Sequence, residues 1–409
     1  MRTNRTHWIP VLLLVQLVFS VTSCKPKDKH VSQNTPSLDQ LMEAAGRGNA
    51  TAQCNLGVRY HEGDGVRKDY AEAVKWFGRA ANQDNAMAQF NLGLCLAKGE
   101  GVTKDEVEAV KWLRKAADSR HIQAQFWMGL CYAGGKGVPK DDEEALRWFR
   151  RAADQDYPNA KYNLGILYQR GNGVPKDNVE AVNWFRSAAV QGFAQAQFNF
   201  GLCLEMGEGI ARNEVEAAKW IRKAADQGFA PAQFKLGLCC TKGQGVAKDP
   251  VEEAKWFGKA ANQGNVMAQF NFGLCLAKGR GIAKNEEAAA IWFHKAAGQG
   301  FTPAQATLGV MYYEGRGVSR NVDEAAKWFR LAADKGDTQA QSFLGVMYSD
   351  GVAVSKDLVE GYKWLFLAAR HGDTNATAKL GLQAKQMSKE EVREAEQRAA
   401  SFRESDAFR

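Results

Sequence analysis

The sequence lacks the short motifs on which most enzymatic sites depend. It has six histidines in 409 residues, without an H-E-x-x-H segment or a histidine pair at helical spacing, so no zinc-protease type of site is predicted. It contains no S-x-x-K, S-D-N or K-T-G segment, which removes the template of the serine β-lactamases. No G-K-[ST] accompanies its G-x-G segments, so they are not phosphate loops. We therefore expect no catalysis, no cofactor and no bound metal.

The chain also lacks a strong excess of one charge. Its 54 basic and 46 acidic residues give a net charge of +8. Five basic residues and one acidic residue fall within residues 1–36, which leaves only 49 − 45 = +4 for the rest. Nucleic-acid-binding proteins usually concentrate basic charge on one face, so no nucleic-acid partner is expected.

No hydrophobic run is long enough for a confident membrane span. The longest, Ile9 to Val21, has 13 residues and follows Arg2 and Arg5, the arrangement of a secretory signal. It ends in V-T-S-C at residues 21–24, which resembles the bacterial lipobox and implies cleavage before Cys24 and lipidation of that residue. The alternative is an ordinary secretory signal in which Cys24 is incidental.

The targeting segment leads to a prediction of location. We expect a lipoprotein signal peptide at residues 1–23 and a flexible, polar tether at residues 24–36. The protein would be secreted across the bacterial inner membrane and held in the cell envelope by the lipid on Cys24, facing the periplasm or exposed on the surface.

What the sequence does have is a repeat of 36 residues. A Leu-Gly pair, or Met-Gly or Phe-Gly in its place, recurs in ten copies from Leu56-Gly57 to Leu380-Gly381. A tryptophan follows in the same register at Trp76, Trp112, Trp148, Trp184, Trp220, Trp256, Trp292, Trp328 and Trp364. A fixed period in this range is typical of solenoid proteins.

Each repeat predicts two helices joined by a turn. Apolar and small residues at helical spacing, such as Ala88, Leu92 and Leu96, indicate the first helix. A G-x-G segment followed by Val or Ile ends it in eight copies. The second helix begins after an Asp or Asn N-cap with Glu three residues later, an acidic variant of the capping box, as at Asp105 and Glu108. A glycine near its end in the later copies, such as Gly192, indicates a left-handed C-cap. We interpret the tryptophan within the second helix as a packing residue. The glycine inside the first helix indicates close approach of a neighbouring helix.

The pattern A-x-x-x-L-G-x-x-[YL]-x-x-G-x-G-V-x-x-[DN]-x-x-E-A-x-x-W-x-x-x-A-A resembles the Sel-one-like repeat, a branch of the tetratricopeptide-like solenoids. The resemblance implies an all-α, right-handed α-solenoid of antiparallel helix hairpins. We expect an N-terminal capping helix at 37–48, about nine full repeats and a partial one at 49–387, and a C-terminal capping helix at 388–409.

The resemblance favours a protein–protein interaction scaffold of the cell envelope that binds a partner protein or peptide on its concave face. Two alternatives remain open. Some relatives have been linked to β-lactam or cell-wall chemistry, which would make the protein an envelope hydrolase. It could instead be a surface-exposed factor that interacts with a host.

Five of the eight cysteines share one position of the first helix: Cys95, Cys131, Cys203, Cys239 and Cys275. Equivalent positions on packed helices are roughly 8–10 Å apart, beyond the ~7 Å Cα limit for a disulfide. The same spacing prevents them from sharing one zinc ion. We interpret them as reduced packing residues, and leave open an isolated bridge involving Cys54 or Cys240.

Departures from the repeat suggest where a partner binds. The residue before the Leu-Gly pair is an asparagine in several copies, Asn55, Asn91, Asn163, Asn199 and Asn271, and is replaced by Trp127, Lys235, Phe343 or Lys379 in others. In tetratricopeptide-like solenoids the first helices line the concave surface, so we predict that Trp127, Phe343, Asn91, Asn163, Asn199, Lys235 and Asn271 contact the partner. The alternative is that this column is buried between adjacent first helices.

Overall fold

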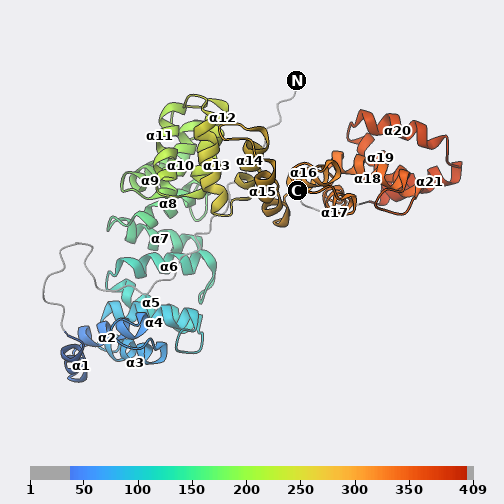
Figure 1. The fold of residues 1–409 in the computed structure, drawn as a ribbon. Helices are drawn as coiled ribbons and strands as arrows, with labels where there is room; N and C mark the ends of the chain where they lie inside the picture. The colour runs from blue at the N-terminus through green and yellow to red at the C-terminus, as the bar shows by residue number, and fades with distance from the viewer. Residues whose placement is uncertain (1–36, 403–409) are drawn as a thin grey trace. The chain divides into compact units, whose positions relative to one another are not determined.

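The computed structural model describes residues 37–402, and within that range the chain forms 21 α-helices and no strand. The chain divides into two compact units at residues 1–193 and 194–409, and Figure 1 shows the order of the helices along each. The all-α fold of 36-residue hairpins is therefore as predicted. None of the described helices has the length and apolarity required to cross a membrane.

The described part of the first unit contains nine helices, each packed against the next. They are α1 (Leu38–Gly46), α2 (Ala50–Glu62), α3 (Tyr70–Ala81), α4 (Ala86–Lys98), α5 (Glu106–Asp118), α6 (Ile122–Gly134), α7 (Asp142–Ala153), α8 (Pro158–Arg170) and α9 (Asn178–Val190). Even-numbered helices are the first helices of the repeats. The predicted N-terminal capping helix is α1, which buries Leu41 and Ala45 and opens with a capping box at Ser37 and Gln40.

In the described part of the second unit, each helix from α10 to α20 packs against the next, and α21 packs on α19. The helices are α10 (Ala194–Met206), α11 (Glu214–Asp226), α12 (Ala230–Lys242), α13 (Pro250–Asn262), α14 (Val266–Lys278), α15 (Glu286–Gly298), α16 (Thr302–Glu314), α17 (Val322–Ala333), α18 (Thr338–Asp350), α19 (Leu358–Arg370), α20 (Thr374–Ala384) and α21 (Lys389–Ser401). The helix predicted after residue 388 is α21, with its capping box at Ser388 and Glu391.

The glycine inside each first helix from α2 to α18 lets the two helices of a hairpin approach closely. A Cβ added to Gly165 would lie 2.5 Å from Cε1 of Phe185, and Phe185 is completely buried. Gly129 and Gly309 have the same relation to Phe149 and Phe329. The aromatic or aliphatic residue after each tryptophan therefore fills the space that a side chain on the glycine would occupy.

The G-x-G turn connects one repeat to the repeat before it. Gly101 has φ +71° and an added Cβ would lie 2.2 Å from the carbonyl oxygen of Tyr70, the first residue of α3. Glycine is thus required here both by backbone conformation and by the close approach of another chain segment. In the last copy Ala353 adopts φ 60° in place of the glycine, a conformation that is strained for alanine.

The ends of the second helices agree with the prediction in most details. The carboxylate of Asp105 accepts a hydrogen bond from the Glu108 backbone N–H at 2.9 Å. The Glu side chain, however, does not complete a capping box: Glu108 pairs with Lys111 Nζ at 2.8 Å, and Glu72 with Lys75 at 2.9 Å. Left-handed residues follow these helices, glycine in later copies and Asp84, Arg120 and Asp156 in the first three.

A series of buried glutamines joins successive repeats within each unit. Gln125 on α6 donates from Nε2 to the carbonyl of Ala117 on α5 at 3.1 Å. Its Oε1 accepts from Gln155, just after α7, at 2.7 Å. Gln53, Gln233 and Gln269 make the same pair of bonds in their repeats. Because these amides are buried, each bond they make removes a desolvation cost and fixes the spacing between neighbouring hairpins.

Candidate partner-binding surface

Within each unit, first helices share a half-exposed face that follows the predicted asparagine column. Besides that column it contains an aliphatic residue three positions later, half-exposed at Leu130, Ile166, Leu202, Leu238, Leu274, Val310 and Val346. Residues three apart lie on the same side of a helix, so the two columns run together. We call this surface, formed by the asparagine column and the aliphatic column, the first-helix face.

Asn163, Asn199 and Asn271 lie on this face and are partly accessible. Asn163 and Asn271 each donate a side-chain hydrogen bond at 2.8 Å to the backbone carbonyl four residues earlier. This local bond fixes the orientation of the amide and uses only part of its hydrogen-bonding capacity. Polar groups held in this way on a half-apolar surface are suited to binding an extended peptide or a helix.

The position of Asn91 differs from the prediction that it contacts a partner. Its side chain is 0% exposed, so it presents no surface to a partner. Neither amide atom has a hydrogen-bond partner among the described residues, although buried amides are normally paired. The first-helix face therefore does not extend to Asn91.

Trp127 belongs partly to the core and partly to the surface. Its ring is half-buried and packs against two hydrophobic clusters, one containing Phe90 and Trp148 and the other containing Phe126 and Phe149. The two alternatives for this column were contact with a partner and burial between first helices, and Trp127 is both partly buried and partly accessible. Its buried part joins two repeats, and its accessible part contributes to the first-helix face.

Phe343 has a similar double position in the second unit. Its ring stacks on Phe329 with centroids 4.7 Å apart and an interplanar angle of 4°, and it lies 5.7 Å from the ring of Tyr313. Lys235 differs, because its Nζ pairs with Glu205 of the preceding repeat at 2.8 Å. That ion pair lies on the first-helix face and is largely shielded from solvent, with both side chains under a fifth exposed.

The tryptophan column is structural, in agreement with the sequence interpretation. Trp148, Trp256 and Trp364 are buried. Several half-buried members carry the cation three residues later over their rings, with Lys115 Nζ 4.1 Å from the Trp112 centroid and Lys223 Nζ 3.8 Å from that of Trp220. These rings are covered by their own helix and are not arranged as a ligand cage.

The five cysteines of the column are buried free thiols, as the spacing argument predicts. Burial raises the pKa of Cys95 and Cys203 to about 12 and that of Cys131, Cys239 and Cys275 to about 11. Because the thiolate is the reactive form, burial keeps these thiols protonated at neutral pH when no cation is bound beside them. Cys240 is also a buried free thiol.

One cluster of chemically distinct side chains was not predicted. His61 at the end of α2, Cys95 on α4 and Glu100 in the turn after α4 have ligand atoms that all lie within 4.8 Å of one another. His61 Nε2 is 3.0 Å from Glu100 Oε2. Alignment of the repeats could have revealed the cluster, because His61 occupies the position that Ala97 has in the next repeat, only two residues from Cys95.

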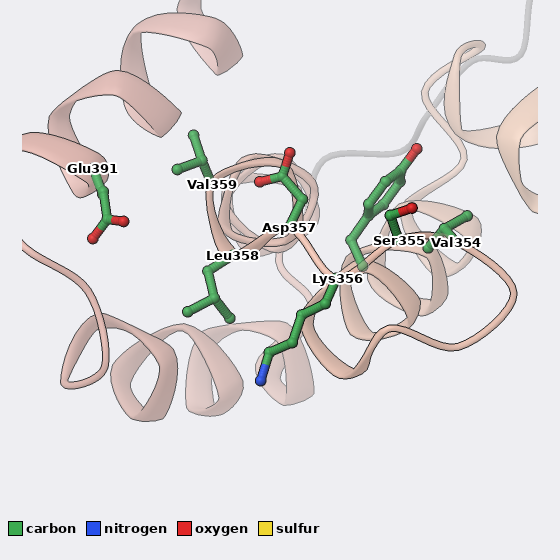
Figure 2. Close-up of a pocket in the computed structure, with 8 residues that line it drawn as sticks. Val354, Ser355, Lys356, Asp357, Leu358, Val359 and Glu391 are labelled. Carbon is green, nitrogen blue, oxygen red and sulfur yellow. The ribbon is translucent and has the colours of Figure 1, made fainter.

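An open recess of about 650 Å³ lies beside the start of α19, lined by residues 348, 354–359 and 391 (Figure 2). None of the predicted partner-binding residues lines it. The Asp357 carboxylate accepts the backbone N–H of Glu360 at 2.9 Å and so caps α19. Lys356 points away from Asp357 in Figure 2. Lys356 and Asp357 therefore do not form a paired nucleophile and base.

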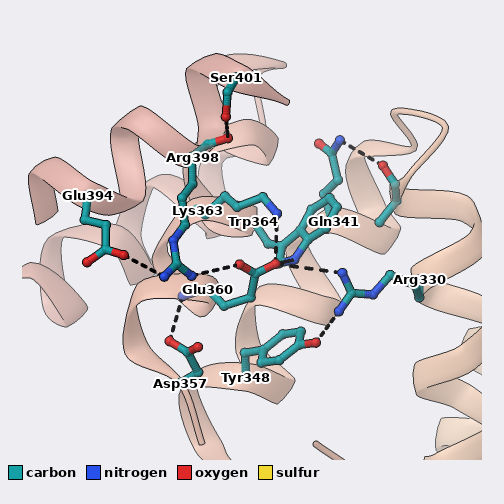
Figure 3. A network of polar contacts seen from close by, with 11 residues as sticks. Arg330, Gln341, Tyr348, Asp357, Glu360, Lys363, Trp364, Glu394, Arg398 and Ser401 are labelled. Atoms are coloured by element: carbon teal, nitrogen blue, oxygen red, sulfur yellow. Dashed lines mark hydrogen bonds and ion pairs between the residues drawn. The ribbon is translucent and has the colours of Figure 1, made fainter. Parts of the chain in front are cut away.

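A polar network beside this recess fixes the C-terminal helix (Figure 3). The Glu360 carboxylate accepts hydrogen bonds from Lys363 Nζ and Trp364 Nε1, each at 2.8 Å. Arg398 on α21 and Arg330 on α17 approach the same group at 3.5 and 3.8 Å. Glu360 is only 15% exposed, so this charge cluster holds α21 against α19 rather than attracting a ligand.

Repeated hairpins of this kind, joined through shared cores and buried glutamines, define an α-solenoid protein. The chain belongs to the Sel1 repeat family, whose sequence model matches nine consecutive segments: 50–85, 86–121, 122–157, 158–193, 194–229, 230–265, 266–301, 302–337 and 338–373. Sel1 repeat proteins are generally scaffolds for protein–protein interaction, bind protein partners and are typically not enzymes.

Two solved structures are similar over most of the chain. One is c5321, a protective antigen present in uropathogenic Escherichia coli strains displaying an SLR fold, with 31% identity over 89% of this chain and 86% of that chain and a TM-score of 0.56. The other is a Sel1 repeat protein from Oxalobacter formigenes, with 33% identity over 77% and 91% of the two chains and a TM-score of 0.58. A comparison with curated proteins gave no match.

Proposed function

We propose that the protein is an interaction scaffold of the bacterial cell envelope that binds a partner protein or peptide on the first-helix face. The observation that carries this proposal is the half-exposed combination of an oriented asparagine with aliphatic side chains on first helices of each unit. Trp127 and Phe343 add aromatic area to it, and aromatic residues are frequent hot spots of interfaces.

The scaffold acts without catalysis of its own. An envelope hydrolase acting on cell-wall or β-lactam substrates would need a nucleophile beside a base. In the recess of Figure 2, Asp357 caps α19 and Lys356 points away from it, so these two side chains are not arranged in this way. Metal and nucleic acid likewise have no part in the partner-binding surface proposed.

Location in the envelope depends on the signal segment, which lies outside the described residues. The lipobox-like sequence ending at Cys24 supports lipidation of that residue. Residues 24–36 then connect the lipid to the first helix as a tether. The solenoid would be held near a membrane while its first-helix face remains available to a partner.

The experiment is affinity capture from membranes after crosslinking, with the N-terminal segment intact. Asn271→Arg places a large charged side chain on the first-helix face, and Val251→Arg places the same side chain on the exposed surface of the neighbouring second helix. Loss of a captured protein from Asn271→Arg but not from Val251→Arg supports the proposal. Equal capture by both variants contradicts it.

A second candidate function is favoured by one comparison. The similar E. coli chain is a protective antigen, which supports exposure on the cell surface and interaction with host proteins. Proteolysis of intact cells separates the candidates: a periplasm-facing scaffold is protected until the outer membrane is opened, whereas a surface-exposed factor is cleaved at once.

A further inference from the structure

We propose that His61, Cys95 and Glu100 form a binding site for a zinc-type divalent metal ion at the junction of the first two repeats. The site lies within the first unit and is separate from the column of asparagines. It brings an imidazole nitrogen, a sulfur and a carboxylate oxygen together from α2, α4 and the turn that follows α4.

The geometry needs only small adjustments to hold such an ion. The three ligand atoms lie within 4.8 Å of one another, and His61 Nε2 and Glu100 Oε2 are 3.0 Å apart. Tetrahedral zinc with Zn–S of ≈ 2.3 Å and Zn–N and Zn–O of about 2.0–2.2 Å separates its ligands by roughly 3.3–3.6 Å. Small side-chain rotations, chiefly of Glu100, whose side chain is 27% exposed, bring the ligand atoms to these distances.

The chemistry of the donors selects the class of metal. A thiolate, an imidazole and a carboxylate are the three ligand types that zinc accepts together, whereas calcium and magnesium require oxygen ligands. Three protein ligands leave a fourth position for water. Cys95 is fully buried while His61 and Glu100 are partly accessible, so the ion would enter from the side of these two residues.

The charged side chain of Lys98, next to Glu100, does not prevent a metal ion from binding at this site. Lys98 Nζ is 3.5 Å from the same Glu100 oxygen, a contact that the metal would replace. The ring of Tyr70 packs edge-on against His61 with centroids 4.8 Å apart and restricts its orientation. An orientation fixed by packing lowers the cost of coordinating a metal.

No other repeat combines these three residue types at the matching positions. At the next junction the corresponding residues are Ala97, Cys131 and Lys136. Cys131 therefore provides a matched control: it occupies the same place on its helix as Cys95, and it is also buried, but it has no histidine or glutamate at the equivalent positions.

The test uses the full chain with reduced thiols, freed of metal and titrated with Zn²⁺ against a chromophoric chelator. We expect one Zn²⁺ per chain, at least about tenfold weaker binding in Cys95→Ser and in Glu100→Gln, and unchanged binding in Cys131→Ser. Co²⁺ in place of Zn²⁺ should give a thiolate charge-transfer band that Cys95→Ser abolishes.

Hydrogen exchange gives an independent readout. Zn²⁺ should slow amide exchange in α2 and α4 of the wild type and of Cys131→Ser, with no effect in Cys95→Ser. The proposal is overturned if the folded wild type binds no Zn²⁺, or if Glu100→Gln, which changes a partly exposed side chain, binds it as tightly as the wild type.

Discussion

His121 shows how a single residue adapts to its place in the repeat. It stands where Asn49, Asn85 and Asn265 cap other first helices, and its Nδ1 accepts a hydrogen bond from the Ala124 N–H at 3.2 Å. Burial lowers its pKa from 6.5 to about 4. A buried neutral histidine that acts as an acceptor must lose this bond when it is protonated.

The first prediction concerns this titration. Because the folded pKa lies below the unfolded one, the contribution of His121 to stability should be constant above pH 6.5 and fall as the pH decreases towards about 4. The loss from this group is at most about 1.4 kcal/mol per pH unit. His121→Asn should keep the cap and remove this part of the pH dependence, as measured by denaturant unfolding across the window. An unchanged pH slope would contradict the assignment.

The second prediction separates core from surface aromatics. Trp148→Ala removes a ring that is 3% exposed and should destabilise its repeat by about 3–5 kcal/mol, as for buried aromatics generally. Trp127→Ala and Phe343→Ala remove half-buried rings, so they should cost clearly less stability and weaken partner capture more. Melting curves measured beside capture yields decide this. If Trp127→Ala destabilises as much as Trp148→Ala, Trp127 is a core residue.

At the scale of the element, the hairpin depends on a glycine that only some copies need. Gly165 faces Phe185 at a distance that excludes a side chain, whereas a Cβ added to Gly381 would meet nothing within 4 Å. Both glycines occupy the same position in a first helix. They differ because α20 belongs to the last copy, in which no second helix of the tryptophan type follows.

The third prediction uses this pair. Gly165→Ala should destabilise the protein by about 1–3 kcal/mol, the usual range for overpacking. Gly381→Ala should be neutral or should stabilise α20 by up to about 1 kcal/mol, because alanine favours the helix. Denaturant unfolding combined with hydrogen exchange in α8 and α20 measures both. Equal destabilisation by the two substitutions would refute the close-packing explanation.

Periodic features were predictable from sequence, and features that join repeats were not. The N-caps, the left-handed residues after the second helices and the close approach at Gly165 follow from local chemistry. The buried glutamines recur at the same position of each repeat, which the sequence shows. Their hydrogen-bond partners, however, lie 8 and 30 positions away, as Ala117 and Gln155 do for Gln125. The complete burial of Asn91 depends on the side chains around it in three dimensions. His61 and Cys95 are 34 positions apart in the sequence, and they are close in space because α2 and α4 are the first helices of neighbouring repeats.

At the scale of the whole molecule, location and binding are separate properties. The fourth prediction is that Cys24→Ser releases the protein from membranes, because the lipid would no longer be attached. Fractionation with metabolic lipid labelling checks it, and a fold-neutral variant such as Gly381→Ala serves as the control. Membrane retention of Cys24→Ser, with no lipid label on the wild type, would show that Cys24 is incidental.

The central claim is that partners bind the first-helix face, and site-specific photocrosslinking tests it most directly. A benzophenone side chain would replace Asn199 or Asn271 on that face, and Lys219 or Lys255 on exposed second-helix surfaces of the same unit. We predict that both first-helix positions crosslink the same partner in cells and that neither lysine position does. Crosslinking of that partner from Lys219 and Lys255, with none from Asn199 and Asn271, would contradict the account.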